Sequence, residues 1–385
     1  MTSKEASDFT KDWPELQLKA SSADYYFESY NHYGVHEDIF QDGVTIQAFQ
    51  QAILQNSHMF EGKVVLEVSS GLGLCSLWAA KAGARKVIAL ETHEELVELS
   101  RRAAELNGYS EVIDVVCGKP SSIKQLPGGV EAVDIIVCVF MGFFLLYEAR
   151  LEELLDARDK WLKPGGLMFP DRAKLFVSLL QDADYKRKHY DYYDEVWGFD
   201  FSCMKEAAKA EPALLDCDEV YVKASLLLVA MPFAPSSVLA SLISSITSVL
   251  NLDLLHCSVA DCYNMASKFK LRCRHEGSLD AMVFWFEVWF GACHKPICFS
   301  TGPESTQTCW KQTVFFLQGT TRRVKAGDEV HCMLALRKLL KERRHLDIKI
   351  ACKVNTGSQQ VKCSCRSASA TALLFVMCRG CFRMI

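Results

Sequence analysis

A glycine-rich turn between two acidic residues is the part of the sequence whose residue types and spacing could do chemistry. Glu67 lies at the end of an apolar run, which continues into Ser69-Ser-Gly71-Leu-Gly73. Glu91 follows the next apolar run. Glycines allow a backbone to approach a ligand closely, and the N-terminus of a following helix presents unpaired N–H groups. We therefore expect a nucleotide to bind here, with Glu91 accepting hydrogen bonds from ribose hydroxyls.

The same residues leave the identity of the nucleotide open. Gly71-x-Gly73-x-x-Ser76 is compatible with a degraded dinucleotide loop, and a glycine pattern alone is weak evidence. Glu67 favours S-adenosylmethionine (SAM), because the amino group of that cofactor requires a nearby acid.

Strands and helices alternate around this turn. Helical periodicity is present at 74–82 and 94–106, and short apolar runs predict strands at 63–68, 86–90, 111–117 and 133–137. This alternation implies a doubly wound parallel sheet and an α/β fold class. We assign residues 23–170 to this Rossmann-like domain and residues 1–22 to a flexible N-terminal tail.

Strand-like runs dominate after Pro170. They occur at 173–179, 220–229, 281–289 and 329–336, and predict an antiparallel β-barrel domain over 171–385. One stretch, 236–255, differs because its apolar residues fall on a helical stripe: Val238, Leu239, Leu242, Ile246, Val249 and Leu250. We predict an apolar helical insertion over 230–257, an amphipathic helix that packs on the protein or on a partner rather than crossing a membrane.

Composition narrows the function classes. The chain has 385 residues, a formal net charge of -4 and no dominant block of Lys or Arg, so direct nucleic-acid binding is not expected. Its 17 cysteines and polar N-terminus predict a reducing compartment, the cytoplasm or alternatively the nucleus. Cys363-Ser-Cys365 and Cys378-Arg-Gly-Cys381 have ligand-like spacing. Because the first pair alternates on an apparent strand, we expect no metal.

Seven stretches resemble the signature sequences of type I protein arginine methyltransferases. In matching order and spacing they are Asp24–Tyr30, Gly34–Glu37, Ala79–Lys86, Met141–Glu148, Phe169–Arg172, Phe299–Thr301 and Trp310–Phe315. The resemblance covers residues 24–365. It implies a SAM-binding sheet domain, a β-barrel, and a helical dimerisation arm at 186–210 around Trp197-Gly-Phe-Asp200. It also implies head-to-tail dimers.

The sequence departs from that family where the substrate should bind. The family holds the substrate guanidinium with two glutamates on one loop; Val139 stands at the first position, and Glu148 matches the second as a vestigial contact. A histidine that should pair with Asp42 is Cys309. Leaving a buried charge without its partner costs about 3–5 kcal/mol, and an apolar valine adds a desolvation cost for the cation. No intact catalytic set is therefore expected.

The cofactor pocket has also lost groups that the resemblance requires. Thr45 replaces an arginine that clamps the SAM carboxylate, Ser69 replaces the first loop glycine, and Ser121 replaces a glutamate that reads adenine. The cofactor-binding residues that remain are Gly71, Gly73 and Glu91. SAM binding in this chain is therefore predicted to be weak or absent.

Together these features predict a catalytically inactive paralogue, a "prozyme" that regulates or activates an active type I arginine methyltransferase. The two subunits would join through the arm as a heterodimer or a heterotetramer, and arginine-glycine-rich proteins are the expected substrates of the complex. Two alternatives stay open. The chain could be an active SAM-dependent enzyme with a divergent site, or a non-catalytic scaffold that binds arginine-glycine-rich RNA-binding proteins.

Overall fold

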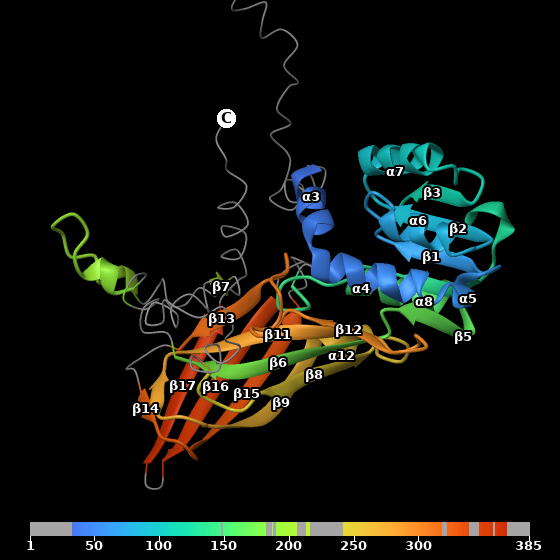
Figure 1. Cartoon of the computed structure of the whole chain (residues 1–385). Helices are drawn as coiled ribbons and strands as arrows, with labels where there is room; N and C mark the ends of the chain where they lie inside the picture. Colours follow the sequence, from blue (N-terminus) through green and yellow to red (C-terminus); the bar gives the residue numbers. More distant parts are fainter. Residues whose placement is uncertain are drawn as a thin grey trace, which may run out of the picture.

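Two domains and a segment that projects from the barrel, residues 190–205, are seen in the computed structural model (Figure 1). We call residues 190–205 the projecting segment. The structure describes residues 33–147, 149–181, 187, 190–205, 213–215, 242–317, 322–338, 346–356 and 359–367. The predicted tail at 1–22, the predicted strand at 220–229 and most of the first half of the predicted helical insertion lie outside these residues.

Among the described residues, the sheet is preceded by the helices α3 (Tyr33–Gln41), α4 (Gly43–Leu54) and α5 (Ser57–Phe60). Asp42 begins α4, and its carboxylate accepts a hydrogen bond from the N–H of Thr45 at 3.0 Å. This N-cap satisfies a donor that the first turn of a helix otherwise leaves unpaired. The helix α4 extends between the sheet domain and the barrel (Figure 1).

A parallel sheet forms the first domain, as predicted. Its order is β3-β2-β1-β4-β5, with α6, α7, α8 and the 3₁₀ turn η1 in the connections. The bounds are β1 (Val64–Val68), α6 (Leu74–Lys81), β2 (Lys86–Glu91), α7 (Glu94–Leu106), β3 (Ile113–Cys117), η1 (Pro127–Gly129), β4 (Val133–Val137), α8 (Leu151–Trp161) and β5 (Leu162–Phe169). The strand order reverses at β1 and β4, and ligands of such sheets bind beyond the carboxyl ends of the strands at that point.

Antiparallel strands form the second domain, which also agrees with the predicted barrel. One sheet has the order β7-β13-β11-β6-β8 with β12 beside β11, another has the order β17-β16-β15-β9, and β10 pairs with β14. The bounds are β6 (Arg172–Leu180), β7 (Ala213–Leu215), β8 (Thr247–Asp253), α12 (Val259–Tyr263), β9 (Asn264–Arg272), β10 (Gly277–Leu279), β11 (Ala281–Phe290), β12 (Ile297–Ser300), β13 (Gln312–Phe316), β14 (Arg322–Val324), β15 (Glu329–Lys338), β16 (Leu346–Thr356) and β17 (Gln359–Ser367).

The predicted helical insertion at 230–257 is wrong over its second half. Residues 247–253 form β8, which pairs antiparallel with β6. Ile246, expected on the buried stripe, is 38% exposed, whereas Leu252, which is off the stripe, is buried. Pairing with an apolar neighbouring strand has outweighed the local helical period. Within the described residues, no helix is long and apolar enough to span a membrane.

Four buried phenylalanines join the two domains. Phe290 of β11 packs edge-on against Phe49 of α4 at 4.9 Å between ring centroids, and lies 6.2 Å from Phe169 of β5. Phe169 in turn meets Phe60 of α5 at 5.1 Å. All four are almost fully buried. The packing of the sheet domain on the barrel therefore depends on this cluster.

Phe290→Ala should lower the free energy of unfolding by about 3–5 kcal/mol, because it leaves a cavity where the cluster meets the barrel. Phe199→Ala makes the same substitution at an exposed position and should change stability by no more than about 0.5 kcal/mol. Urea unfolding followed by tryptophan fluorescence measures both. Equal effects of the two substitutions would contradict the role given to the cluster.

Candidate functional site

The turn after β1 has the backbone conformation that the glycine pattern predicts. Gly71 and Gly73 have φ angles of 54° and 77°. A Cβ on Gly73 would lie 2.5 Å from the Ser100 hydroxyl, so only glycine fits at the start of α6. Ser69 also adopts a positive φ of 54°, which strains a residue with a side chain.

The carboxylate of Glu91 is engaged by its own chain. One oxygen accepts from the N–H of Gly71 at 2.8 Å; the other accepts from the N–H groups of Thr92 and His93 and lies 2.9 Å from the His93 Nδ1. Burial alone would raise the pKa of Glu91, but these hydrogen bonds outweigh it and lower the pKa to about 2. The structure thus brings Glu91, Gly71 and Gly73 together as predicted, with the acid already hydrogen-bonded.

Glu67 lies beneath the turn and is buried. It accepts from the N–H of Ser76 at 2.8 Å and from the Ser76 hydroxyl. Burial raises its pKa to about 7, although the hydrogen bonds from Ser76 act in the opposite direction. Glu67 therefore stabilises the first turns of α6.

Glu153 is a site residue that sequence reasoning missed. The Ser69 hydroxyl donates to its carboxylate at 2.6 Å, and the Arg150 guanidinium lies 3.5 Å from its other oxygen. This contact joins the nucleotide turn to the first turn of α8. The available signal was the pair of acids, Glu152 and Glu153, at the start of a predictable helix.

Asp42 keeps a contact with the barrel despite the loss of the expected histidine. The Cys309 N–H donates to its carboxylate at 3.0 Å, and the Thr45 hydroxyl donates at 2.8 Å. Trp310 Nε1 donates to the same hydroxyl at 3.1 Å. Burial and the Asp42 charge raise the pKa of the Cys309 thiol well above its ordinary range. Asp42 thus keeps hydrogen-bond donors from the barrel at position 309, although the expected imidazolium is absent from the sequence.

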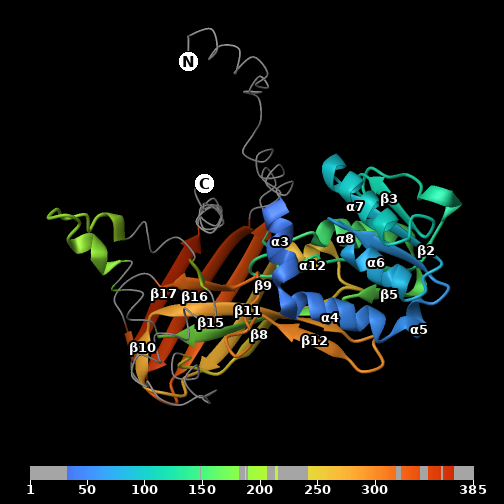
Figure 2. The ribbon, with the colours of Figure 1, turned by 45° about the horizontal axis from the view of Figure 1, so that its top comes forward.

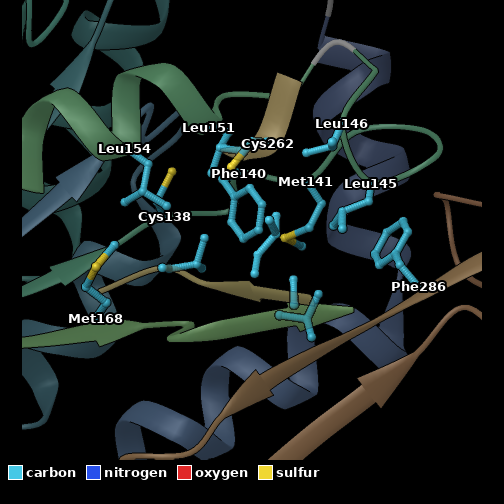
Figure 3. Packing of buried hydrophobic residues seen from close by; sticks show 14 of the residues in the cluster. Cys138, Phe140, Met141, Leu145, Leu146, Leu151, Leu154, Met168, Cys262 and Phe286 are labelled. Atoms are coloured by element: carbon cyan, nitrogen blue, oxygen red, sulfur yellow. The ribbon is translucent and has the colours of Figure 1, made fainter. Parts of the chain in front are cut away.

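The loop after β4 is apolar and buried. It runs from Cys138 to Tyr147, with Val139 half-buried and Phe140, Met141 and Leu145 packed in the core. Figure 3 shows Phe140 and Met141 in the packed interior between α8 and the barrel strands. Burial, and then the charges of Glu153 and Glu67, raise the pKa of the Cys138 thiol, which locates these two acids near the loop. Both acids are hydrogen-bonded elsewhere, as described above.

The remaining predicted positions lie apart from this cluster or outside the described residues. Ser121 is exposed in the loop after β3, and Glu148 is outside the described residues. Cys363 and Cys365 both lie within β17. In the part of the chain that the structure describes, no three His, Cys, Asp or Glu side chains could hold a metal ion.

The parallel sheet with its glycine turn, joined to an antiparallel barrel, defines a two-domain methyltransferase of the SAM-dependent class. Residues 65–166 match the family model of a methyltransferase domain, and residues 171–359 match that of the arginine methyltransferase oligomerization subdomain. Protein arginine N-methyltransferase 1 of Caenorhabditis elegans is 38% identical over 86% of this chain and 88% of its own length. The enzyme of that name from Schizosaccharomyces pombe is 38% identical over 86% and 90%. The chain therefore belongs to the protein arginine N-methyltransferase family.

Solved structures agree with this assignment. The Trypanosoma brucei PRMT1 enzyme-prozyme heterotetrameric complex with AdoHcy contains a chain that is 29% identical, with a TM-score of 0.76, over 88% of this chain and 100% of that one. Arabidopsis thaliana protein arginine methyltransferase 10 is 26% identical, with a TM-score of 0.73, over 89% of this chain and 100% of its own.

Glu67→Gln should remove a pH dependence of stability. The folded state holds the Glu67 proton up to about pH 7, whereas the unfolded chain releases it near 4.5. Between these values the folded state binds more protons, so stability falls as pH rises, by up to roughly 1.4 kcal/mol per pH unit. Urea unfolding at about pH 5 and about pH 7.5 should therefore show the wild type losing stability relative to Glu67→Gln.

The control is Glu105→Gln, which removes one carboxylate from the exposed face of α7. It corrects for the loss of one negative charge. If the stability of the wild type changes in parallel with that of Glu67→Gln between about pH 5 and about pH 7.5, Glu67 does not keep its proton in the folded state.

Proposed function

We propose that this chain is a catalytically inactive member of its family and acts as the regulatory subunit of an active arginine methyltransferase. Val139 is the observation that carries the proposal. It lies two residues after the end of β4, at the carboxyl edge of the sheet, where the family resemblance requires a carboxylate for the substrate guanidinium. The described acids near this loop do not replace it, because Glu67 is bonded to Ser76 and Glu153 to Ser69.

The expected effect on the reaction is large. Leaving a buried guanidinium without one of its two carboxylates costs about 3–5 kcal/mol. If that loss falls on the transition state, the rate drops by about a hundred- to several-thousand-fold. The half-buried side chain of Val139 would also take water from the substrate cation without replacing its hydrogen bonds.

The cofactor groups support the same proposal. Thr45 is fully buried, and its hydroxyl bonds both Asp42 and Trp310, so it offers no cation to the SAM carboxylate. A ribose would have to displace the hydrogen bonds of Glu91 with the turn. Ser69 places a side chain where the backbone should approach the ligand, and Glu153 holds it there. These residues fit a tightly bound SAM poorly, and we propose that binding is weak or absent.

The projecting segment supports a role as a subunit. Trp197 is 93% exposed, and Phe199, Phe201 and Met204 are also exposed. Figure 2 shows this segment extending away from the barrel strands. Clustered exposed aromatic side chains mark protein interfaces. The match to an oligomerization subdomain and the similarity to an enzyme-prozyme heterotetramer favour an active methyltransferase as the partner.

We expect the purified chain to transfer no methyl groups from labelled SAM to an arginine-glycine peptide, and to raise the rate of an active arginine methyltransferase from the same organism. The measurement is label incorporated by each protein alone and by the mixture. Val139→Glu in this chain should leave it inactive, because the cofactor contacts at Thr45 and Ser69 are missing as well.

Other results would favour the alternatives. Methyl transfer by the unaltered chain alone, or its recovery in Val139→Glu, would favour an enzyme with a divergent site. Tight binding of arginine-glycine peptides with no effect on any methyltransferase would favour a scaffold. Either result would overturn the proposed regulatory role.

Trp197→Ala should weaken association with the active subunit by about thirtyfold or more, since a central exposed tryptophan at an interface typically contributes at least about 2 kcal/mol. Analytical ultracentrifugation of the mixture measures this change. Met333→Ala, which truncates an exposed apolar side chain on β15, is the control. Unchanged affinity in Trp197→Ala would show that the partner binds elsewhere.

A further inference from the structure

A helix cap brings two thiols together beside α12. Ser258 is the N-cap of this helix; its hydroxyl accepts from the Asp261 N–H, and the Asp261 carboxylate accepts from the Ser258 N–H at 2.8 Å. In such a capping box, the residue before the cap packs against the fourth helical residue. Here these two positions are Cys257 and Cys262. The cap therefore places two sulfur atoms where other proteins place two apolar side chains.

The two thiols interact with each other and with a guanidinium. The Cys262 thiol donates to the Ser258 carbonyl at 3.3 Å, and the side chains of Cys262 and Cys257 lie close enough to interact. Arg158 of α8 donates to the carbonyls of Leu254 and Cys257 at 2.7 and 2.8 Å, and its side chain is hydrogen-bonded to the Cys257 sulfur as well.

These contacts lower the pKa of Cys257 below its ordinary value. The hydrogen bond from Cys262 has the largest effect, partial burial opposes it, and the Arg158 charge adds to it; the nearby Asp253 carboxylate raises the pKa slightly. The pKa of Cys262 moves in the opposite direction, because of its bond to Cys257 and its burial. Cys257 is thus the more acidic of the two thiols.

The two thiols differ in how deeply they are buried. Cys257 is half-buried, and its neighbours His256 and Ser258 are exposed, so this residue lies at the surface of the barrel domain. Cys262 is fully buried. Figure 3 shows it beside Leu151 and next to Phe140, in the interior where α8 meets the barrel domain. The thiol nearer the surface, Cys257, is therefore also the more acidic one, whereas Cys262 is buried.

We propose that Cys257 and Cys262 form a peroxide-reactive dithiol, in which Cys257 attacks hydrogen peroxide and Cys262 then closes a disulfide. In the first step the Cys257 thiolate bonds to one peroxide oxygen and the O–O bond breaks, giving a sulfenic acid and a hydroxide, which becomes the first water by taking up the proton that Cys257 released to solvent when it ionised. In the second step the Cys262 sulfur displaces that oxygen as water, after losing its proton. The two sulfurs are oxidised together by two electrons, and the peroxide is reduced to two waters.

The site is independent of the proposed regulatory role. It joins β8 and α12 of the barrel domain to α8 of the sheet domain, through the Arg158 bonds. Oxidation removes the Cys257 thiolate from Arg158 and links the residue before the helix cap covalently to the helix. A disulfide here would therefore fix the start of α12 and remove one contact of this segment with α8 of the sheet domain.

The test is a timed exposure of the full chain to hydrogen peroxide, followed by trapping of sulfenic acid with a dimedone probe and peptide mass spectrometry. Cys257 should oxidise about tenfold faster than the exposed thiols Cys117 and Cys203. The product should be a Cys257–Cys262 disulfide that dithiothreitol reverses. In Cys262→Ser, Cys257 should instead accumulate as the trapped sulfenic acid, and in Cys257→Ser, Cys262 should stay reduced.

Ser258→Ala is the matched control, because it keeps both thiols and Arg158 but removes the cap. It should slow disulfide closure several-fold, with circular dichroism showing that the chain still folds. Oxidation of Cys257 no faster than that of Cys203, or a sulfenic acid that persists in the unaltered chain without a disulfide to Cys262, would overturn the proposal.

Discussion

The buried Asp42 carboxylate is the polar interaction that ties α4 to the barrel beside the phenylalanine cluster. It caps α4, accepts the Thr45 hydroxyl, and accepts the backbone N–H of Cys309 from the barrel. A buried carboxylate is stable only when its lone pairs are occupied, so Asp42 needs donors from the chain around it. The backbone N–H of Cys309 is such a donor, and it does not depend on which side chain position 309 carries. The scaffold has therefore been kept while a side chain of the expected catalytic set has changed.

The same principle explains the state of the nucleotide turn. Glu67, Glu91 and Glu153 are held by Ser76, by Gly71 with His93, and by Ser69 respectively. Each acid has been satisfied by the protein itself, which makes the pocket a stable part of the fold without a ligand. An active site keeps some of its polar groups available for the substrate, at a cost in stability. In the described part of this chain, few polar groups of the nucleotide turn remain available for a ligand. This is consistent with the inactive role that we propose.

Much of the fold could be predicted because its signals are local. The alternating strands and helices around Gly71 and Gly73 set the parallel sheet, and α7 has the predicted bounds. The helix expected around 247–255 was wrong because the apolar period of that stretch also suits a strand, and only its pairing with β6 decides between the two. Side-chain contacts were harder to predict from the sequence. The bond from Ser69 to Glu153 joins residues far apart in the chain, and no periodic pattern indicates it. The bond from the Cys309 N–H to Asp42 could not be predicted for the same reason.

The exposed indole of Trp197 has a consequence for the amount of this protein that persists in a cell. A protein that covers the segment binds the folded chain and not the unfolded one, so it adds stability in proportion to the logarithm of its free concentration. A chain left without such a protein keeps an apolar surface of the kind that chaperones and proteases act on. The abundance of the folded chain then follows that of the protein that covers it, and the ratio of the two is set after translation, by mass action at a single surface.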